Sequence, residues 1–429
     1  MYNKIFEDYG FEFRMTPSTS CILEGTKNKL YLLFEILVKE QKEKTKLKNP
    51  FNLALVLDRS GSMQGVKLDF AKKAVSEVVS NLRPLDTLHL VIYDTQVEVI
   101  FEKGDLRRKN LLLQKIKQIL SGNSTFLSGG LLQGAELVQK HLSKDKSNRV
   151  FIFSDGLANV GLKSLEELTN VAKQINKKGI NITSFGIGED FDEDIMQNLA
   201  LHGKGDYFFI DNADKIPNIV EEAIEGLLGL VLSNVELKLR SEKGVDIKKV
   251  YAYEDSIILG DVRETETRQV LVEVEVDPEV AEPNKLLSFD LQYRIIADIM
   301  NDKSYSETLG IPFTTNEEDI MNENADVLLT KHLLETAEKE LEISKLIENL
   351  ELDKAITSQQ QLIHSLKNLS LNDKDGLLAE KIAFLENVLS RIQSGDYLMS
   401  RKMSRYSSYS SYYSKKRKMM DIMDSKGKK

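Results

Sequence analysis

Short apolar runs alternate with amphipathic stretches through the first half of this chain. Residues 52–57, with the sequence NLALVL, form an apolar run typical of a strand that is covered on both faces. Residues 67–82 follow with apolar positions at helical spacing, and the alternation continues to about residue 231. This order predicts a doubly wound α/β domain with a mostly parallel six-stranded sheet. The other strands are expected at 87–93, 96–101, 149–154, 181–187 and 206–210, and the other helices at about 107–120, 129–142, 164–177, 192–200 and 215–230.

The strands expected at 87–93 and 96–101 are separated only by Asp94 and Thr95. A parallel neighbour would need a crossover of about a dozen residues, so a link this short requires a hairpin. The sequence therefore predicts that one edge strand of the sheet runs antiparallel to the others.

A different pattern flanks this domain on both sides. After residue 233 the segments VELKLR, DSIILGDV, RQVLVEVEV and LLSFDLQYRII alternate apolar and polar residues, which is typical of antiparallel strands. The N-terminal segments FEFRM, CILEG and KLYLLFEILVKE have the same pattern. Neither set has helices of its own, so we expect residues 1–48 and 233–315 to form one antiparallel β-sandwich. The α/β domain, residues 49–232, is then an insertion whose chain ends lie close together.

The C-terminal part is expected to be helical and then disordered. Residues 316–399 carry apolar residues at helical intervals and contain no proline, which predicts a helical hairpin or a three-helix unit. No strict heptad persists long enough to argue for a coiled coil. Residues 400–429 are rich in serine, tyrosine and lysine, and we expect this tail to be disordered because it cannot bury a core.

Composition and charge narrow the function. The chain is 41% apolar and 29% charged, as in soluble globular proteins, and a net charge of −9 gives no reason to expect nucleic-acid binding. Cys21 is the single cysteine, so no disulfide can form within the chain. The N-terminus lacks the basic start and apolar run of a signal peptide, and no run of about 18 apolar residues occurs. We therefore expect a cytoplasmic protein without a membrane span.

One cluster of residues carries candidate chemistry. The sequence LDRSGSM follows the first strand of the α/β domain and contains Asp58, Ser60 and Ser62 at intervals of two. Thr125 lies in the loop SGNSTFLSGG between two expected helices, and Asp155 follows the fourth strand in FSDG. The carboxyl ends of parallel strands meet at one edge of a sheet, where doubly wound folds bind ligands. We therefore expect three loops to bring these five side chains together.

All five side chains offer hard oxygen atoms, and none is histidine or cysteine. Such a set selects Mg²⁺, Ca²⁺ or Mn²⁺ over zinc or copper, and we expect Mg²⁺. Two carboxylates and three hydroxyls leave an octahedral ion with bound water and at least one exchangeable position. A carboxylate from an Asp or Glu of a protein partner could displace water at that position.

The pattern Asp-x-Ser-x-Ser, then Thr, then Asp resembles the metal-ion-dependent adhesion site of von Willebrand factor type A domains, and all five positions are present. The segments SDGLANVG and SFGIG are similar to those of bacterial intracellular members and of the heavy chains of inter-alpha-trypsin inhibitor. The resemblance covers about residues 50–232 and implies a Rossmann-like fold. It also implies that Ser60, Ser62 and Thr125 touch the metal, while Asp58 and Asp155 act through water.

Other interpretations stay open at this stage. Asp58 and Asp155 could cap the helices that follow them, since aspartate is favoured at helix N-termini. Glu189 and Asp190 follow the fifth strand near this edge of the sheet and could tune its charge, but we expect them to be solvated loop acids. The leading hypothesis is a non-enzymatic, metal-dependent interaction scaffold, with no catalytic residue and no nucleotide site. The alternatives are a metal-assisted phosphoesterase, an adaptor for an AAA+ ATPase, and a structural protein that oligomerises through its helical region.

Overall fold

The computed structural model describes residues 4–39, 50–143, 146–188, 190–253, 257–283, 285–296, 302–320, 323–369, 373 and 376–412. The chain divides into two compact units. One is the α/β domain, made mainly from residues 43–234, and the other combines the N-terminal strands with the strands and helices that follow residue 234. Among the described residues, none of the helices has the length and apolar character needed to cross a membrane.

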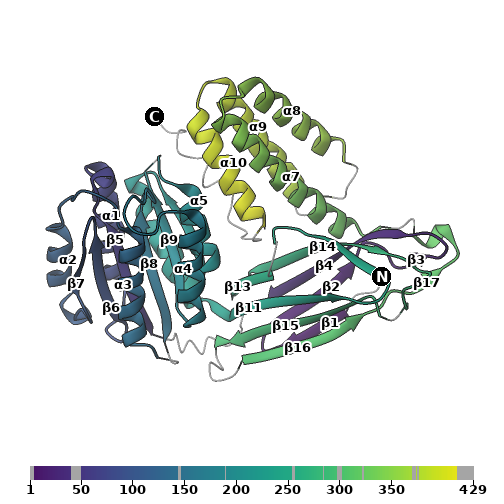
Figure 1. Cartoon of the computed structure of the whole chain (residues 1–429), viewed down its shortest axis with the longest axis horizontal. Helices are drawn as coiled ribbons and strands as arrows, with labels where there is room; N and C mark the ends of the chain where they lie inside the picture. Colours follow the sequence, from purple (N-terminus) through teal and green to yellow (C-terminus); the bar gives the residue numbers. More distant parts are fainter. Residues whose placement is uncertain are drawn as a thin grey trace. The chain divides into compact units, whose positions relative to one another are not determined.

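The α/β domain is built on a six-stranded sheet with helices on both faces (Figure 1). Helices α1, α2 and α6 share a core with one face of the sheet, and α3 packs on the other face. The strands are β5 (Phe51–Asp58), β6 (Thr87–Tyr93), β7 (Val97–Phe101), β8 (Ser147–Ser154), β9 (Asn181–Ile187) and β10 (Lys204–Ile210). The helices are α1 (Val66–Asn81), α2 (Lys109–Lys117), α3 (Leu127–Lys140), α4 (Leu165–Lys177), α5 (Glu193–His202) and α6 (Ile216–Leu228).

The strand order is β10-β9-β8-β5-β6-β7, so β5 has parallel neighbours on both sides. Every residue of β5 is buried, as its apolar sequence predicted. The chain passes from β5 to β6 on one side and later returns to β8 on the other, and the strand order therefore reverses at β5. The loops after β5 and β8 lie at this switch point, where doubly wound sheets bind ligands.

The edge of the sheet confirms the predicted hairpin. β7 pairs antiparallel with β6 and has no second strand neighbour in the sheet. The other predicted strands and helices of this domain agree with the observed elements to within a few residues at each end. The predicted doubly wound, mostly parallel sheet is therefore confirmed.

The second unit contains two larger antiparallel sheets, and one of them combines strands from both sides of the α/β domain. One sheet has the order β1-β2-β4-β14-β12, and another has the order β13-β11-β15-β16. Strands β4 and β14 pair along their whole length, from Thr267 opposite Leu37 to Val276 opposite Asn28. The predicted insertion of the α/β domain into an antiparallel β-sandwich is therefore confirmed. The strands are β1 (Lys4–Asp8), β2 (Phe11–Pro17), β3 (Ile22–Leu23), β4 (Asn28–Val38), β11 (Leu230–Ser241), β12 (Val245–Val250), β13 (Ile257–Arg263), β14 (Thr267–Val276), β15 (Leu287–Ile295), β16 (Asp302–Leu309) and β17 (Phe313–Thr314).

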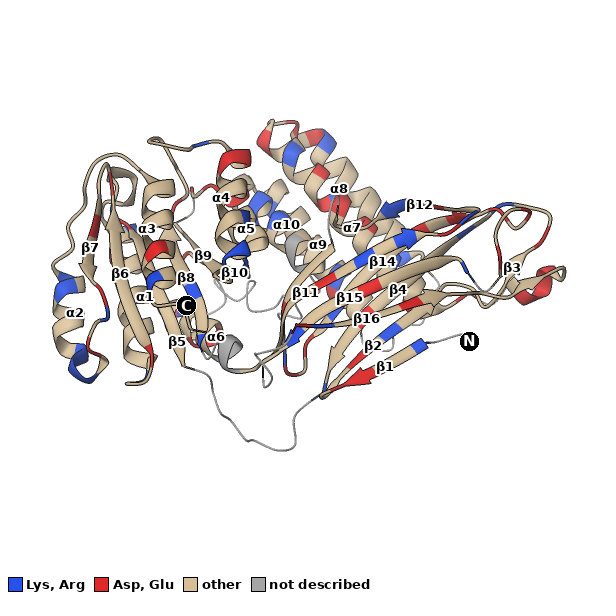
Figure 2. Cartoon of the chain, turned by 60° about the horizontal axis from the view of Figure 1, so that its bottom comes forward, with Lys and Arg blue, Asp and Glu red and all other residues tan. Residues whose placement is uncertain are grey.

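Aromatic side chains fill the space between the two larger sheets. The ring of Phe289 on β15 lies 5.4 Å from that of Phe13 on β2 and 5.7 Å from that of Phe34 on β4. Charged residues of both signs lie on β4 and on β14 (Figure 2). Lys29 and Glu273, on these paired strands, form an ion pair at 2.7 Å. The face away from Phe289 carries polar residues near the strand ends, but at the centre Leu33 and Leu271 are buried there against the helical region.

Among the described residues after the sandwich, four helices are present: α7 (Ala325–Glu348), α8 (Leu352–Lys367), α9 (Leu377–Gln393) and α10 (Tyr397–Tyr412). Their shared core includes Ile343, Ala355 and Phe384. Val327, near the start of α7, packs against Leu33 of the sandwich. The helical region is therefore larger than the predicted hairpin or three-helix unit.

The structure corrects the prediction that disorder begins at residue 400. Residues 397–412 form α10, and its serines 404, 407 and 408 are buried. The Ser408 hydroxyl donates to the Ala337 carbonyl of α7 at 2.8 Å. Serine is small enough to let two helices approach closely, so this segment packs on its neighbours although it has few apolar residues. The predicted tail beyond 412 lies outside the described residues.

Candidate metal centre

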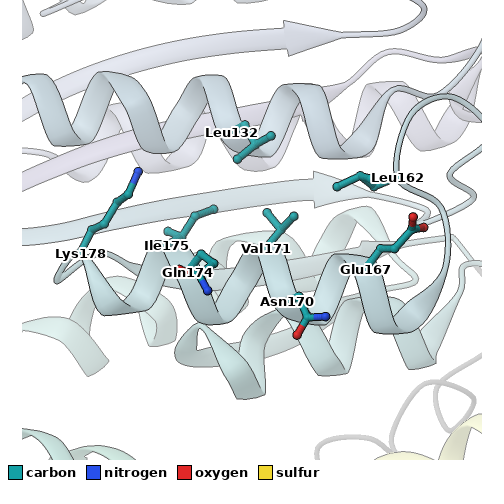
Figure 3. Close-up of a pocket in the computed structure, with 8 residues that line it drawn as sticks. All are labelled: Leu132, Leu162, Glu167, Asn170, Val171, Gln174, Ile175 and Lys178. Atoms are coloured by element: carbon teal, nitrogen blue, oxygen red, sulfur yellow. The ribbon is translucent and has the colours of Figure 1, made fainter.

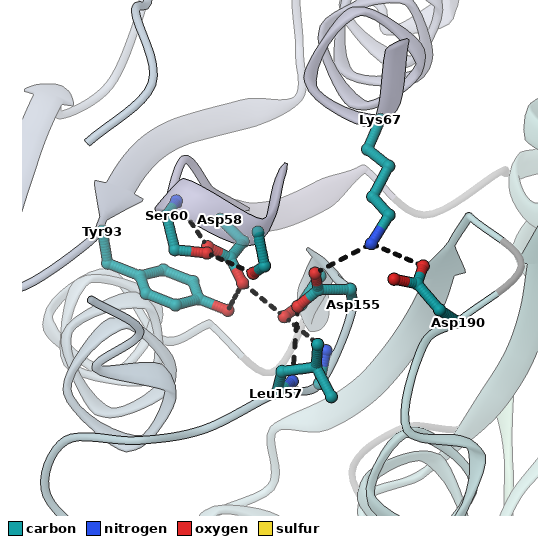
Figure 4. A network of polar contacts seen from close by, with 10 residues as sticks. Asp58, Ser60, Lys67, Tyr93, Asp155, Leu157 and Asp190 are labelled. Atoms are coloured by element: carbon teal, nitrogen blue, oxygen red, sulfur yellow. Dashed lines mark hydrogen bonds and ion pairs between the residues drawn. The ribbon is translucent and has the colours of Figure 1, made fainter. Parts of the chain in front are cut away.

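Asp58 is the last residue of β5, and its side chain is fully buried. The Ser60 backbone N–H donates to its Oδ1 atom at 2.8 Å. The Ser154 hydroxyl donates to Oδ2 at 2.6 Å, and the Tyr93 hydroxyl donates to the same oxygen at 3.3 Å (Figure 4). These hydrogen bonds fix the orientation of the carboxylate, but none of them supplies a positive charge.

The electrostatics of Asp58 favour a bound cation. The pKa of Asp58 is raised to about 6, mainly by burial and also by the negative charge of Asp155, while hydrogen bonds from Ser154 and Ser60 act in the opposite direction. Burial also raises the pKa of Tyr93 above its ordinary value, so its hydroxyl stays protonated and can donate. Two buried carboxylates that repel each other are both stabilised by a cation beside them. This donor chemistry fits a divalent metal ion.

The loop after β5 carries the two serines of the motif. Ser60 is fully buried and Ser62 is exposed, and their hydroxyl oxygens lie 3.2 Å apart. The N–H of Gly61, between them, donates to the Asn123 carbonyl at 2.6 Å. A Cβ atom at Gly61 would lie 3.1 Å from that oxygen, so the close approach of the two loops favours glycine here.

Thr125 lies buried in the loop between α2 and α3. Its N–H donates to Asn159 Oδ1 at 2.7 Å, and its carbonyl accepts from the N–H groups of Asn159 and Val160 at 3.1 Å each. In the same loop, the Gly122 N–H donates to the Arg59 carbonyl at 2.6 Å. Hydrogen bonds thus join the loops after β5, α2 and β8 at one edge of the sheet.

Asp155 directly follows β8 and is fully buried. The Leu157 N–H donates to its Oδ1 atom at 3.3 Å. The Lys67 ammonium, from the first turn of α1, lies 3.3 Å from Oδ2 and 2.5 Å from an oxygen of Asp190 (Figure 4). Asp190 therefore belongs to this network and is not simply the solvated loop acid that we expected. Glu189 lies outside the described residues.

Neither aspartate of the motif caps a helix. Helix α1 begins after Gly65, and α4 begins after Ser164, whose hydroxyl accepts from the Glu167 N–H. Asp58 and Asp155 lie several residues before these helix starts. The structure therefore removes helix capping as the reason for their presence.

The structure places all five predicted residues at the switch point, on three loops that hydrogen-bond one another. Sequence reasoning missed Lys67, Tyr93 and Ser154, which contact the two carboxylates. Ser154 could have been found, because it ends the strand that Asp155 follows. No described part of the chain gathers three or more His, Cys, Asp or Glu residues into a metal-binding group. A metal at this edge would therefore depend on hydroxyls as well as carboxylates.

A groove of about 370 Å³ lies between α3 and α4 in the same domain (Figure 3). Its two charged residues already bind neighbours: Glu167 accepts from the Ser164 hydroxyl at 2.8 Å, and Lys178 donates to Gln139 at 3.1 Å. The groove thus offers mainly apolar surface, without the convergent charged groups of a small-molecule site. It is lined by Leu132, Leu162, Glu167, Asn170, Val171, Gln174, Ile175 and Lys178.

Comparison with known proteins identifies the domain that carries this site. The family model for the von Willebrand factor type A domain matches residues 52–222, which include all three loops. Residues 52–222 form a von Willebrand factor type A domain. The predicted resemblance is thereby confirmed for the domain.

Individual relatives of the von Willebrand factor type A domain are more distant. An uncharacterized protein of Synechocystis is 23% identical over 44% of this chain and 44% of its own length. The inter-alpha-trypsin inhibitor heavy chain H3 of Rattus norvegicus is 24% identical over 47% of this chain and 23% of its own length. The matches thus span less than half the length of these curated relatives, neither of which has the name of an enzyme.

Two solved structures resemble nearly the whole chain. The ArnB paralog VWA2 from Sulfolobus acidocaldarius has a TM-score of 0.63 at 18% identity, over 93% of this chain and 99% of that one. The von Willebrand factor type A protein from Catenulispora acidiphila has a TM-score of 0.66 at 15% identity, over 91% of each chain. The likeness in fold therefore extends beyond the von Willebrand factor type A domain to the flanking strands and helices.

Proposed function

We propose that a divalent metal ion binds at the switch point and that this ion is Mg²⁺. Five oxygen-bearing residues would hold it: Asp58, Ser60, Ser62, Thr125 and Asp155. The bound ion would in turn bind a carboxylate oxygen from an Asp or Glu of a protein partner. The observation that carries this proposal is the gathering of two buried carboxylates and three hydroxyls by three interlinked loops. The choice of Mg²⁺ rests on the preference of hard cations for oxygen ligands.

Each residue has a distinct part in this proposal. Asp58 and Asp155 provide the negative charge, and their backbone N–H and hydroxyl donors keep the carboxylates in place. Ser60 and Thr125 are buried, whereas Ser62 is exposed, so the site can be reached from solvent on the side of Ser62. Two carboxylates balance the formal 2+ charge of the ion but do not fill its coordination shell, so a partner's carboxylate could take a position that water would otherwise hold.

A non-enzymatic role agrees with the hydroxyl contacts. A serine nucleophile needs a base within hydrogen-bond reach. The hydroxyls of Ser60 and Ser62 lie against each other, and no described histidine hydrogen-bonds to either. The site therefore supports binding better than nucleophilic catalysis.

Replacing Asp58 with alanine tests the proposal. The Asp58→Ala protein is expected to bind Mn²⁺, measured by isothermal titration calorimetry, roughly 10–100-fold more weakly than wild type, because the buried carboxylate is lost. Protein partners recovered by affinity purification in Mg²⁺ should be lost both in EDTA and with Asp58→Ala. The matched control is Asp69→Ala, which removes an exposed carboxylate from α1. Recovery of the same partners with and without EDTA would contradict the proposal.

A substitution at Gly122 is expected to weaken metal binding through the loop that carries Thr125. A Cβ atom at Gly122 would lie 1.9 Å from Asp94 Oδ2 and 2.7 Å from Asp94 Cβ, so the loop must move. Asp94 cannot easily give way, because it is buried and accepts from the Gln96 N–H. We expect Gly122→Ala to raise the dissociation constant for Mn²⁺ roughly tenfold.

The control for this substitution is Ser121→Ala, an exposed neighbour in the same loop. It should leave the dissociation constant for Mn²⁺ unchanged. Equal Mn²⁺ binding by Gly122→Ala and Ser121→Ala would show that the position of this loop does not matter to the site.

A further inference from the structure

Lys67 links two carboxylates of very different exposure. The side chain of Asp155 is fully buried and that of Asp190 is 64% exposed, whereas that of Lys67 is 19% exposed. The ammonium lies 2.5 Å from Asp190 Oδ1 but 3.3 Å from Asp155 Oδ2. It is therefore held more closely by the exposed loop acid than by the buried residue of the metal motif (Figure 4).

The position of Lys67 is set by the fold rather than by the two carboxylates alone. Gly188, just after β9, has a φ of +85°, and a Cβ atom there would lie 2.7 Å from Lys67 Cε and 3.1 Å from Cδ. The aliphatic part of Lys67 thus occupies the space that a side chain at residue 188 would fill. Glycine is favoured at this position for two reasons. It adopts the left-handed backbone conformation without strain, and it leaves room for the side chain of Lys67.

We propose that Lys67 acts as a built-in competitor that weakens divalent-cation binding at Asp155, and that Asp190 relieves this competition by drawing the ammonium away. The inference rests on the proposed metal site and adds a means of setting its affinity. Asp155 Oδ1 already accepts from the Leu157 N–H, and Lys67 faces the other oxygen. A metal that uses Asp155 must therefore share the carboxylate with a positive charge.

The direction of the effect follows from Coulomb's law. A lysine ammonium is a compact point charge, and it repels a cation bound to the same carboxylate by an amount that burial makes larger than at the surface. Removing the ammonium charge removes this repulsion, so the metal should bind more tightly at Asp155. Removing the Asp190 carboxylate instead leaves Asp155 as the ion-pair partner described for the ammonium. The ammonium should then compete more strongly with the metal for Asp155. The two substitutions should therefore change metal affinity in opposite directions.

The test measures the dissociation constant for Mn²⁺ alone, by isothermal titration calorimetry, on full-length variants. Lys67→Met should bind Mn²⁺ more tightly than wild type, on the order of tenfold. Asp190→Asn should bind a few fold more weakly. The Lys67→Met/Asp190→Asn double variant should match Lys67→Met, because Asp190 acts through the ammonium. If Asp190 attracted the metal directly, its effect would persist without Lys67, and the proposal would be wrong.

Two further variants keep the test decisive. Lys67→Gln retains a hydrogen-bonding group without the charge, so it should also bind Mn²⁺ more tightly even if Lys67→Met folds poorly. Lys73→Met removes an exposed lysine of the same helix that donates to the Ala213 carbonyl, and it should leave the affinity within about twofold.

The possible failures can be told apart. If wild type binds no Mn²⁺, the proposed metal site fails, and this inference fails with it. If wild type binds Mn²⁺ but neither Lys67 variant binds it more tightly than Lys73→Met does, the metal site stands and the role of Lys67 is refuted.

Discussion

Replacing Lys381 with methionine is expected to lower the free energy of unfolding by roughly 3–5 kcal/mol. Lys381, on α9, lies 2.7 Å from Glu340 on α7, and the two side chains are 2% and 0% exposed. The ammonium also donates to the Ser407 hydroxyl of α10 at 2.8 Å. Without it, Glu340 is left as an uncompensated charge inside the helical region. Burial already raises the pKa of Glu340, so the loss should be smaller at low pH, where this carboxyl can protonate.

Chemical denaturation of full-length variants measures this effect, and two controls define it. Lys339→Met breaks a pair with Glu342 at a similar distance, 2.8 Å, but on the exposed surface of α7, and it should cost less than about 1 kcal/mol. The Glu340→Leu/Lys381→Met double variant removes both buried charges and should recover most of the loss. A cost for Lys381→Met no greater than that for Lys339→Met would contradict the prediction.

The contribution of Asp58 to the stability of the metal-free von Willebrand factor type A domain is expected to fall as the pH rises from about 4 to about 7. Burial raises the pKa of Asp58 from 3.8 to about 6, so the folded state binds a proton that the unfolded state has already released in this range. The stabilisation is complete below the pKa of Asp58 in the unfolded state, 3.8, and it is lost as the pH rises through the pKa in the folded state, about 6. Its size is about 3 kcal/mol, since each pKa unit corresponds to about 1.4 kcal/mol.

Calorimetry in EDTA measures the unfolding free energy of wild type and of Asp58→Asn. The difference between the two proteins isolates the contribution of Asp58 from that of other titrating groups. The neutral amide does not titrate, so the difference in unfolding free energy between the two proteins should change by about 3 kcal/mol across the range. Saturating Mg²⁺ should reduce the pH dependence of wild type, because a bound cation favours the ionised carboxylate. The prediction fails if the stabilities of wild type and Asp58→Asn change in parallel across this range.

The candidate site was predictable from sequence to the extent that it depends on strand ends. Asp58 and Asp155 come directly at the ends of apolar strands, and parallel strands present those ends at one edge. Lys67 gave no such signal, because its place beside Asp155 depends on the direction of α1 and on the space above Gly188. Contacts of that kind are set by tertiary packing, which residue spacing does not contain.

The fold shows the same division. The buried strands of the α/β domain were predictable because their apolar runs are long and regular. Strand β16, with the sequence DKSYSETL, has little apolar content because it lies at the edge of its sheet, and we did not predict it. Helix α10 was taken for a disordered tail because its packing depends on small and polar side chains, such as Ser407 with Lys381. Composition alone undervalues such contacts.

The pairing of β4 with β14 has a consequence for the order of events during synthesis. β4 leaves the ribosome before the inserted domain, and β14 leaves after it, so β4 lacks this neighbour while the intervening residues are made. An unpaired strand edge invites association with other chains. The inserted domain pairs strands that are closer in sequence, which favours early folding. Once folded, it replaces a long flexible loop by a compact body, so fewer loop conformations are lost when the sandwich closes.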